Sequence, residues 1–242
     1  MGSIFVSLTI SGCTSNDNDD VSANDSVTIS AAASLTASFT TLAQQFQDEH
    51  PDIDIKINFG GSGALAQQIA AGAPVDLFAS ASAATMNQIS QLVESPQTFA
   101  RNELIVISPA ANPGQVSDYR SIGTVSTVMC VESAPCGIAA EQFIAEAGIT
   151  AKIVSLEPDV KSVLNKVISD EVDAGVVYVT DAKAAGDRVI SFPIPAEFNV
   201  ITEYQIAPVR DSVNKKASDE FLQFVLGSAG TLVLESEGFM AP

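Results

Sequence analysis

Three short stretches of the sequence bring a hydroxyl group to the end of an expected strand, next to backbone N–H groups that carry no bulky side chain. They contain Ser34, Ser62 and Tyr178. Each comes after a run of apolar and β-branched residues of the length typical of a buried strand. In an open α/β sheet, ligands bind beyond the carboxyl ends of the strands, where the following helices direct their N-terminal N–H groups. The three stretches therefore predict a site for an anion.

The charge balance restricts the partners of such a site. The 242 residues include 11 Lys and Arg against 29 Asp and Glu, the formal net charge is −18, and the first basic side chain is Lys56. This composition argues against nucleic acid or an anionic membrane surface as a partner. A bound anion must therefore be held by local dipoles, against an unfavourable overall field. The acid excess is typical of a soluble surface, and adaptation to high salt is a second hypothesis.

The first 26 residues are expected to export and tether the protein. Residues 4–10 form an apolar run too short to cross a bilayer, and it leads into Ile10-Ser11-Gly12-Cys13. This resembles a lipoprotein signal in which Cys13 carries the lipid after cleavage; a buried or incidental cysteine is the alternative. No Lys or Arg precedes the run, which fits a natural start further upstream. Residues 15–26 have almost no apolar content and predict a solvated tether.

From residue 27 onward, strand and helix patterns alternate, which predicts an α/β fold of mostly parallel sheets flanked by helices. The clearest helix carries one apolar stripe, made of Leu35, Phe39, Leu42 and Phe46. The turn-rich residues 108–114 and the proline-containing residues 192–200 predict two crossings of the chain between lobes.

Several helix ends are marked by capping residues. We expect Ser34 to cap the helix that follows it and Asp159 to cap a helix that begins at Val160. Gly72 and Gly148 are placed to end two further helices.

Longer patterns resemble one family when they are taken in order along the chain. They are Ala31-Ala32-Ala33-Ser34-Leu35, Gly60-Gly61-Ser62-Gly63-Ala64-Leu65, Gly72-Ala73-Pro74-Val75-Asp76-Leu77-Phe78, Ala134-Pro135-Cys136-Gly137, Asp159-Val160-Lys161 and Gly175-Val176-Val177-Tyr178. The ordered set resembles the molybdate-binding proteins of ABC importers, the ModA family. This resemblance implies a two-lobed type II periplasmic-binding-protein fold with the ligand in the interlobe cleft. Residues 1–26 would be signal and tether, residues 27–107 plus 200–242 lobe 1, and residues 108–199 lobe 2.

The resemblance also implies which residues contact the oxyanion. Carried over by position, they are Ser34, Ser62, Cys136, Val160 and Tyr178. The serines would donate hydroxyl and backbone N–H groups, Cys136 and Val160 their backbone N–H groups, and Tyr178 its phenolic O–H. Taken alone, the same residues have simpler roles: Ser34 as a helix cap, Ser62 in a turn, and Val160 and Tyr178 in the core.

The chemistry of such a donor set agrees with the resemblance. Molybdate and tungstate are fully deprotonated dianions near neutral pH, so every ligand oxygen accepts a hydrogen bond. Phosphate still carries a proton there, and a cleft with donors alone leaves that proton unpaired. Sulfate has the same charge and no proton, so cavity size alone separates it from the larger oxyanions.

The cysteines and the single histidine could in principle carry other chemistry. Outside the cytoplasm, Cys130 and Cys136 favour a disulfide over two buried thiols. His50 is far from both in sequence, so no metal site with direct protein ligands is expected. A serine nucleophile would lack a base, and Gly61-Ser62-Gly63 does not match a nucleophile elbow, so the chain is not expected to be an enzyme.

The sequence thus predicts an extracytoplasmic receptor, at the cell surface or in the periplasm, that is anchored by lipid alone. It would capture molybdate or tungstate and deliver it to the membrane permease of an ABC transporter. We expect a monomer that needs no cofactor beyond its bound oxyanion. The alternatives are a receptor for sulfate or another tetrahedral oxyanion, and a surface-anchored sensor without a transport role.

Overall fold

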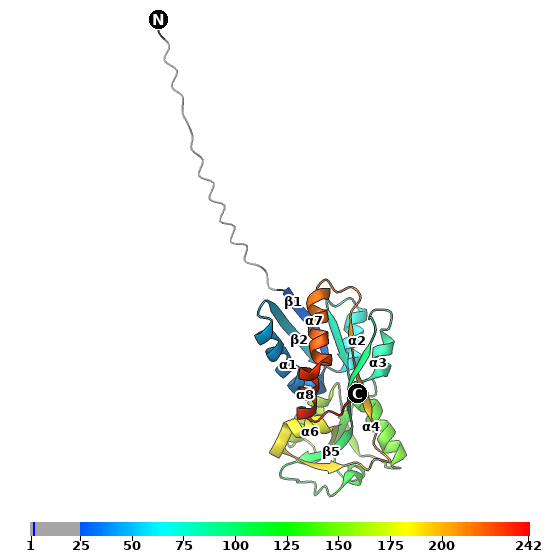
Figure 1. The fold of residues 1–242 in the computed structure, drawn as a ribbon. Helices are drawn as coiled ribbons and strands as arrows, with labels where there is room; N and C mark the ends of the chain where they lie inside the picture. Colours follow the sequence, from blue (N-terminus) through cyan, green and yellow to red (C-terminus); the bar gives the residue numbers. More distant parts are fainter. Residues whose placement is uncertain (1, 3–24) are drawn as a thin grey trace.

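Two separate five-stranded sheets form the framework of the molecule, each with helices packed against it. The computed structural model describes residue 2 and residues 25–242. The lipidation candidate Cys13 and most of the expected signal and tether lie outside these residues. Figure 1 shows the two sheets in two lobes, one above the other. No helix in the described part of the chain has both the length and the apolar content needed to cross a membrane.

The first sheet has the strand order β2-β1-β3-β10-β4. Strand β1 is parallel to its neighbours β2 and β3, whereas β10 is antiparallel to β3 and β4. Helices cover both faces, and the central strand β3 is accordingly buried at all four of its residues. The strands are β1 (Asp25–Ala32), β2 (Ile53–Gly60), β3 (Leu77–Ser80), β4 (Gln97–Asn102) and β10 (Thr202–Pro208).

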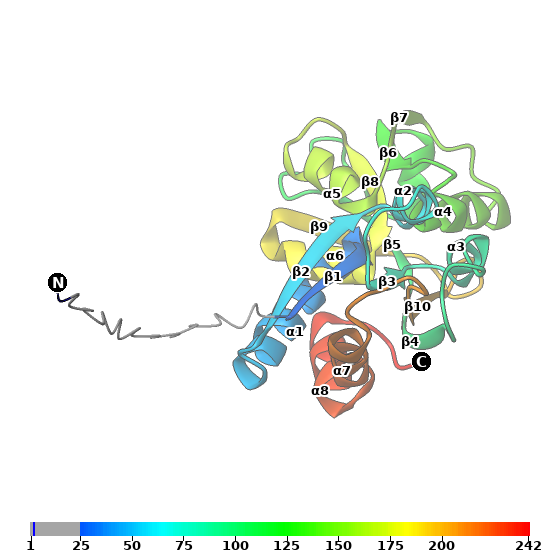
Figure 2. The same cartoon turned by 90° about the horizontal axis from the view of Figure 1, so that it is seen from above.

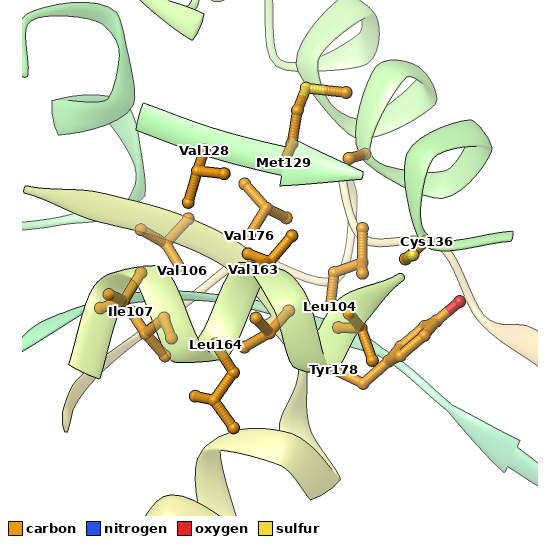
Figure 3. Close-up of a cluster of buried hydrophobic side chains, with 14 of the residues drawn as sticks. Leu104, Val106, Ile107, Val128, Met129, Cys136, Val163, Leu164, Val176 and Tyr178 are labelled. Carbon is orange, nitrogen blue, oxygen red and sulfur yellow. The ribbon is translucent and has the colours of Figure 1, made fainter. Parts of the chain in front are cut away.

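The second sheet has the order β7-β6-β8-β5-β9. Here β6 is parallel to β7 and β8, and β5 is antiparallel to both β8 and β9. Figure 3 shows the apolar cluster against this sheet, to which Val106, Val128, Val163 and Val176 contribute. The strands are β5 (Leu104–Pro109), β6 (Thr127–Cys130), β7 (Ile153–Glu157), β8 (Ala174–Tyr178) and β9 (Val189–Pro193).

The helices follow the strands as the alternating pattern predicts. They are α1 (Thr36–Glu49), α2 (Ser62–Ala70), α3 (Ala83–Gln88), α4 (Pro135–Glu146), α5 (Val160–Ile168), α6 (Val179–Ala185), α7 (Lys215–Leu226) and α8 (Ser228–Glu237), with short 3-10 turns η1 (Ala33–Leu35), η2 (Tyr119–Gly123) and η3 (Gly186–Arg188). The predicted stripe of α1 is buried at Phe39, Leu42 and Phe46. Gly72 and Gly148, both with positive φ, lie just beyond the ends of α2 and α4 as expected.

The boundary between the lobes lies earlier than the sequence indicated. Residues 104–107 were expected in lobe 1, but β5 pairs with β8 and β9 in the second sheet. The chain therefore crosses between Asn102 and Leu104, and the turn at 108–114 lies within lobe 2. It returns between Val200 and Thr202, where β10 begins, close to the expected return. Two adjacent connections of this kind are suited to a hinge.

The lobes are also in contact away from these connections. Ala33 of the first lobe packs into the apolar cluster of the second lobe. Lys183 of α6 donates a hydrogen bond of 2.6 Å to the carbonyl oxygen of Ser236 in α8. Figure 2, which looks down on the molecule, shows the tip of β2 directed toward the elements of the second lobe.

Candidate functional site

A small cleft lies where the two lobes meet at the carboxyl ends of their strands. Its walls are Ala32, Ala33, Ser34, Gly60, Gly61, Ser62 and Ala81 from the first lobe, and Ala134, Pro135, Cys136, Asp159, Val160 and Tyr178 from the second. All five residues that the sequence analysis proposed as oxyanion contacts line this cleft, and each is at most 5% exposed. Their contact with a ligand stays a prediction.

Four helix N-termini converge on the cleft. Ser34 lies in η1, which leads into α1, and Ser62 begins α2; Cys136 lies in the first turn of α4 and Val160 begins α5. The first N–H groups of a helix have no partner within it, and the helix dipole places partial positive charge there. Both lobes therefore present donors and positive dipole ends to the same small space.

Ser62 and Ser34 differ in what their hydroxyl groups contact. The Ser62 hydroxyl oxygen accepts a hydrogen bond of 3.1 Å from the backbone N–H of Ala81. Ser34 does not cap α1, because η1 intervenes and moves the N-cap position to Leu35. Its hydroxyl instead lies 2.8 Å from the hydroxyl of Tyr204 in β10. The expected cap at Ser34 is therefore wrong, and the residue is free to face the cleft.

Ser34 is connected through Tyr204 to further buried polar side chains. The side-chain amide of Asn102 donates to the hydroxyl oxygens of Thr180, at 2.9 Å, and Tyr204, at 3.4 Å. Sequence reasoning missed Asn102 and Tyr204. The alternating pattern around Tyr204 indicates which residues of the strand share a face. It does not indicate that the Tyr204 hydroxyl contacts Ser34, which lies 170 positions earlier in the sequence.

Tyr178 is almost completely buried at the end of β8. Its hydroxyl lies near those of Thr202 and Tyr204, yet forms no hydrogen bond of acceptable geometry within the described part of the chain. Figure 3 shows the Tyr178 ring leaving the apolar cluster with its hydroxyl end on the side where Cys136 lies. Burial above all, together with nearby Asp181, raises the pKa of Tyr178 well above its ordinary value. The side chain is therefore a persistent neutral donor.

The charged groups near the cleft already have polar contacts within the protein. The Asp159 carboxylate, which is in the cleft wall, accepts hydrogen bonds from the backbone N–H of Ser162 at 2.9 Å and from its hydroxyl at 3.2 Å. This confirms the expected cap on α5. The Lys161 ammonium lies 2.9 Å from Oδ1 of the fully buried Asp181. No lysine or arginine is among the described residues that line the cleft.

A disulfide joins Cys130, the last residue of β6, to Cys136 in the first turn of α4. The Cα atoms of the two residues are 5.8 Å apart. The bond closes a short loop that leads directly into one of the four converging helices. It therefore restricts how the N-terminus of α4 can move relative to the second sheet.

Two five-stranded lobes, two crossing segments and a cleft between the lobes define the type II periplasmic-binding-protein fold. The model of the family described as bacterial extracellular solute-binding protein matches residues 27–240. The chain belongs to this family and, within it, to the ModA proteins. The family is one of solute-binding proteins rather than enzymes, and its members act outside the cytoplasm.

Individual relatives support this assignment. The molybdate-binding protein ModA of Mycobacterium tuberculosis is 34% identical over 222 residues, which cover 90% of this chain and 85% of that protein. A Bacillus subtilis protein named as a substrate-binding lipoprotein of an ABC transporter, YvgL, is 28% identical over 99% of this chain and 98% of its own length. The periplasmic molybdate-binding protein of Azotobacter vinelandii has the same fold, with a TM-score of 0.80 at 20% identity over 89% of this chain and 99% of that one.

Proposed function

We propose that this protein captures molybdate or tungstate outside the cytoplasm and delivers it to the membrane permease of an ABC importer. The observation that carries the proposal is the convergence of four helix N-termini and three hydroxyl-bearing side chains on one cleft. Among the residues that the structure describes, no lysine or arginine lines this cleft. Relatives named for molybdate binding, at up to 34% identity, support the same ligand class.

In this proposal each of the five cleft residues has a defined role. Ser34, Ser62 and Tyr178 donate their hydroxyl protons, and Cys136 and Val160 donate their backbone N–H groups. A hydrogen bond to a charged group contributes about 1.5 to 3 kcal/mol. Five such bonds can exceed the cost of association and support sub-micromolar binding. The anion therefore needs no cationic partner in the cleft.

Closure of the lobes is the step that would couple binding to delivery. Ser34 and Ser62 belong to one lobe, whereas Cys136, Val160 and Tyr178 belong to the other. A tetrahedral anion that accepts from both lobes stabilises the closed state over the open one, because only the closed state satisfies all of its oxygens. A permease that recognises the closed form would then receive only loaded protein.

Membrane attachment is part of the same proposal. Cys13 would carry the lipid, and the polar residues that follow it would separate the folded lobes from the membrane. The B. subtilis relative is itself named as a lipoprotein. Intact-mass measurement of protein isolated from its native membrane tests this point: we expect a diacylated Cys13 as the first residue, and an unmodified Cys13 inside the mature chain would contradict it. We further propose that the protein acts as a monomer.

Calorimetric titration tests the ligand. We expect molybdate and tungstate to bind with sub-micromolar affinity, phosphate to give no detectable heat, and sulfate to bind at least tenfold more weakly than molybdate. Tighter binding of sulfate would favour a sulfate receptor. Loss of molybdate uptake on deletion of the gene separates a transport role from that of a sensor.

A further inference from the structure

Two glycines at the start of α2 face backbone carbonyl groups of the opposite lobe. A Cβ atom on Gly61 would lie 2.3 Å from the carbonyl oxygen of Pro158, and one on Gly63 would lie 2.3 Å from that of Ser133. Real Cβ atoms essentially never approach another heavy atom more closely than 3.0 Å. Because both obstacles are backbone atoms, no side-chain rotation can remove the clash.

Neither glycine is required by its own backbone conformation. Gly61 has φ −64° and ψ 127°, a region open to every residue, and Gly63 lies within α2 without a positive φ. Inside a helix, glycine is less favourable than alanine. The absence of a side chain at these positions therefore serves the approach of the lobes and not the local fold.

The two carbonyl groups are fixed parts of the second lobe next to the cleft. Pro158 directly precedes the Asp159 cap of α5 and lies two residues from Val160. Ser133 lies in the loop that the Cys130–Cys136 disulfide closes, just before α4. Each glycine thus meets the segment that leads into one of the helix N-termini of lobe 2.

We propose that Gly61 and Gly63 are specificity-determining residues that set the separation of the closed lobes and thereby the size of oxyanion that both lobes can contact. This inference rests on the proposed oxyanion-binding function. Ser62 lies between the two glycines, so the same contacts fix the distance from its hydroxyl to the donors of α4 and α5. Dianions of equal charge are then distinguished by how well they span this fixed gap.

A methyl group at either position would force the lobes apart. The contacting atoms must separate by at least about 0.7 Å to reach the 3.0 Å limit. Hydrogen-bond distances have a narrow favourable range, so a shift of this size weakens every bond that crosses the cleft. The smaller sulfate ion spans the widened gap less well than molybdate does.

The test compares Gly61→Ala and Gly63→Ala with the wild type and with Ala64→Ser, a control at an exposed position on the same helix. Molybdate and sulfate affinities are measured by calorimetry, and ligand-free melting temperatures report on folding. We expect each glycine variant to bind molybdate at least tenfold more weakly than the wild type does. Where sulfate binding is measurable, the fold loss of sulfate affinity should exceed the fold loss of molybdate affinity. The ligand-free melting temperature should equal that of the wild type. The control should match the wild type.

Small-angle X-ray scattering at saturating molybdate supplies a readout of closure. The glycine variants should remain more extended than the wild type when fully loaded. Wild-type affinity in both variants, or weaker binding with the same compact dimensions at saturation, overturns the proposal. If a variant melts early, its loaded dimensions still decide the question, since they are measured on the folded, liganded protein. Absence of molybdate and tungstate binding by the wild type would instead refute the proposed function itself.

Discussion

The hydroxyl oxygen of Ser62 accepts a hydrogen bond from the backbone N–H of Ala81 in the same lobe, over 3.1 Å. A serine hydroxyl has one proton to donate and two lone pairs to accept with. Because the Ala81 bond uses a lone pair, the proton remains available for another acceptor. Ser62 is 1% exposed and lies in the cleft wall, so we expect that acceptor to be a group inside the cleft.

Replacing Ser62 by alanine should weaken molybdate binding roughly tenfold or more, because a charge-assisted hydrogen bond is lost. The free protein should also lose about 1 kcal/mol of stability, since the buried N–H of Ala81 loses its acceptor. Calorimetry and urea unfolding measure the two effects. Ser38→Ala is the matched control: it removes a buried hydroxyl of the same lobe that donates to the carbonyl oxygen of Leu35, away from the cleft. Equal molybdate affinities of the wild type, Ser62→Ala and Ser38→Ala would show that the anion binds elsewhere.

Tyr178→Phe should separate ligand binding from folding more cleanly. The buried hydroxyl forms no hydrogen bond of acceptable geometry within the described part of the chain, so its removal should leave the ligand-free protein as stable as before or more so. Affinity for molybdate should nevertheless fall by roughly tenfold or more, from the loss of one donor to a dianion. Thermal melting with and without molybdate checks both expectations. A marked loss of ligand-free stability with unchanged affinity would assign the hydroxyl to the fold.

The pH dependence of binding follows from the environment of Tyr178. Burial raises its pKa well above its ordinary value, so the neutral O–H donor persists to higher pH than in an exposed tyrosine. The contribution of this group to stability is complete below the unfolded-state pKa of about 10 and is lost only as pH rises through the higher folded-state pKa. The ratio of wild-type to Tyr178→Phe affinity should therefore stay constant between about pH 8 and about pH 10.5. A ratio that falls across this range would show that the phenol ionises.

Local patterns were sufficient to predict the elements that carry the cleft. The apolar stripe of α1 and the Asp159 cap of α5 depend on residues a few positions apart, and both are confirmed. The five residues carried over by resemblance also meet in one cleft. They come together because parallel strands deliver their following helices to one edge of each sheet.

Contacts between distant residues could not be predicted in the same way. Residues 104–107 were expected in lobe 1 because the turn after them marks the end of a strand but does not reveal which sheet that strand joins. Their pairing partner, β8, lies about 70 residues further along the chain. Ser34 has the sequence context of a cap, and only the fold brings it to Tyr204. Each error concerns a pairing over a long sequence separation.

The Cys130–Cys136 disulfide should contribute about 2 kcal/mol to stability, because it closes a short loop and restricts the unfolded chain. Urea unfolding of the wild type with and without a reductant measures the effect, and Cys130→Ala/Cys136→Ala, which cannot form the bond, should match the reduced protein. The molybdate affinity of the double variant should fall less than that of Ser62→Ala, because the proposed contact of residue 136 is a backbone N–H. Identical unfolding curves in all conditions would show that the bond is absent or without effect on stability.

The ion pair of Lys161 and Asp181 makes the stability of lobe 2 depend on pH in a defined direction. Asp181 is fully buried, its Oδ1 lies 2.9 Å from the Lys161 ammonium, and its Oδ2 accepts a hydrogen bond of 3.3 Å from the backbone N–H of Tyr178. Burial raises the pKa of Asp181 and the attraction of Lys161 opposes that rise. With a folded-state pKa above the unfolded one, the stability linked to this carboxyl is complete at low pH and is lost as pH rises through the folded-state pKa.

Lys161→Met should therefore raise the pKa of Asp181 further and destabilise the protein most at neutral and alkaline pH. Breaking a buried pair typically costs 3–5 kcal/mol, and since Lys161 is 26% exposed we expect about 3 kcal/mol near pH 8 and a smaller loss near pH 5. Urea unfolding at the two pH values measures this difference. The control Lys161→Met/Asp181→Asn removes the buried charge as well, so its stability should recover in part and vary less with pH. An equal loss at both pH values in the single variant would mean that Lys161 stabilises lobe 2 by the packing of its side chain and not by its charge.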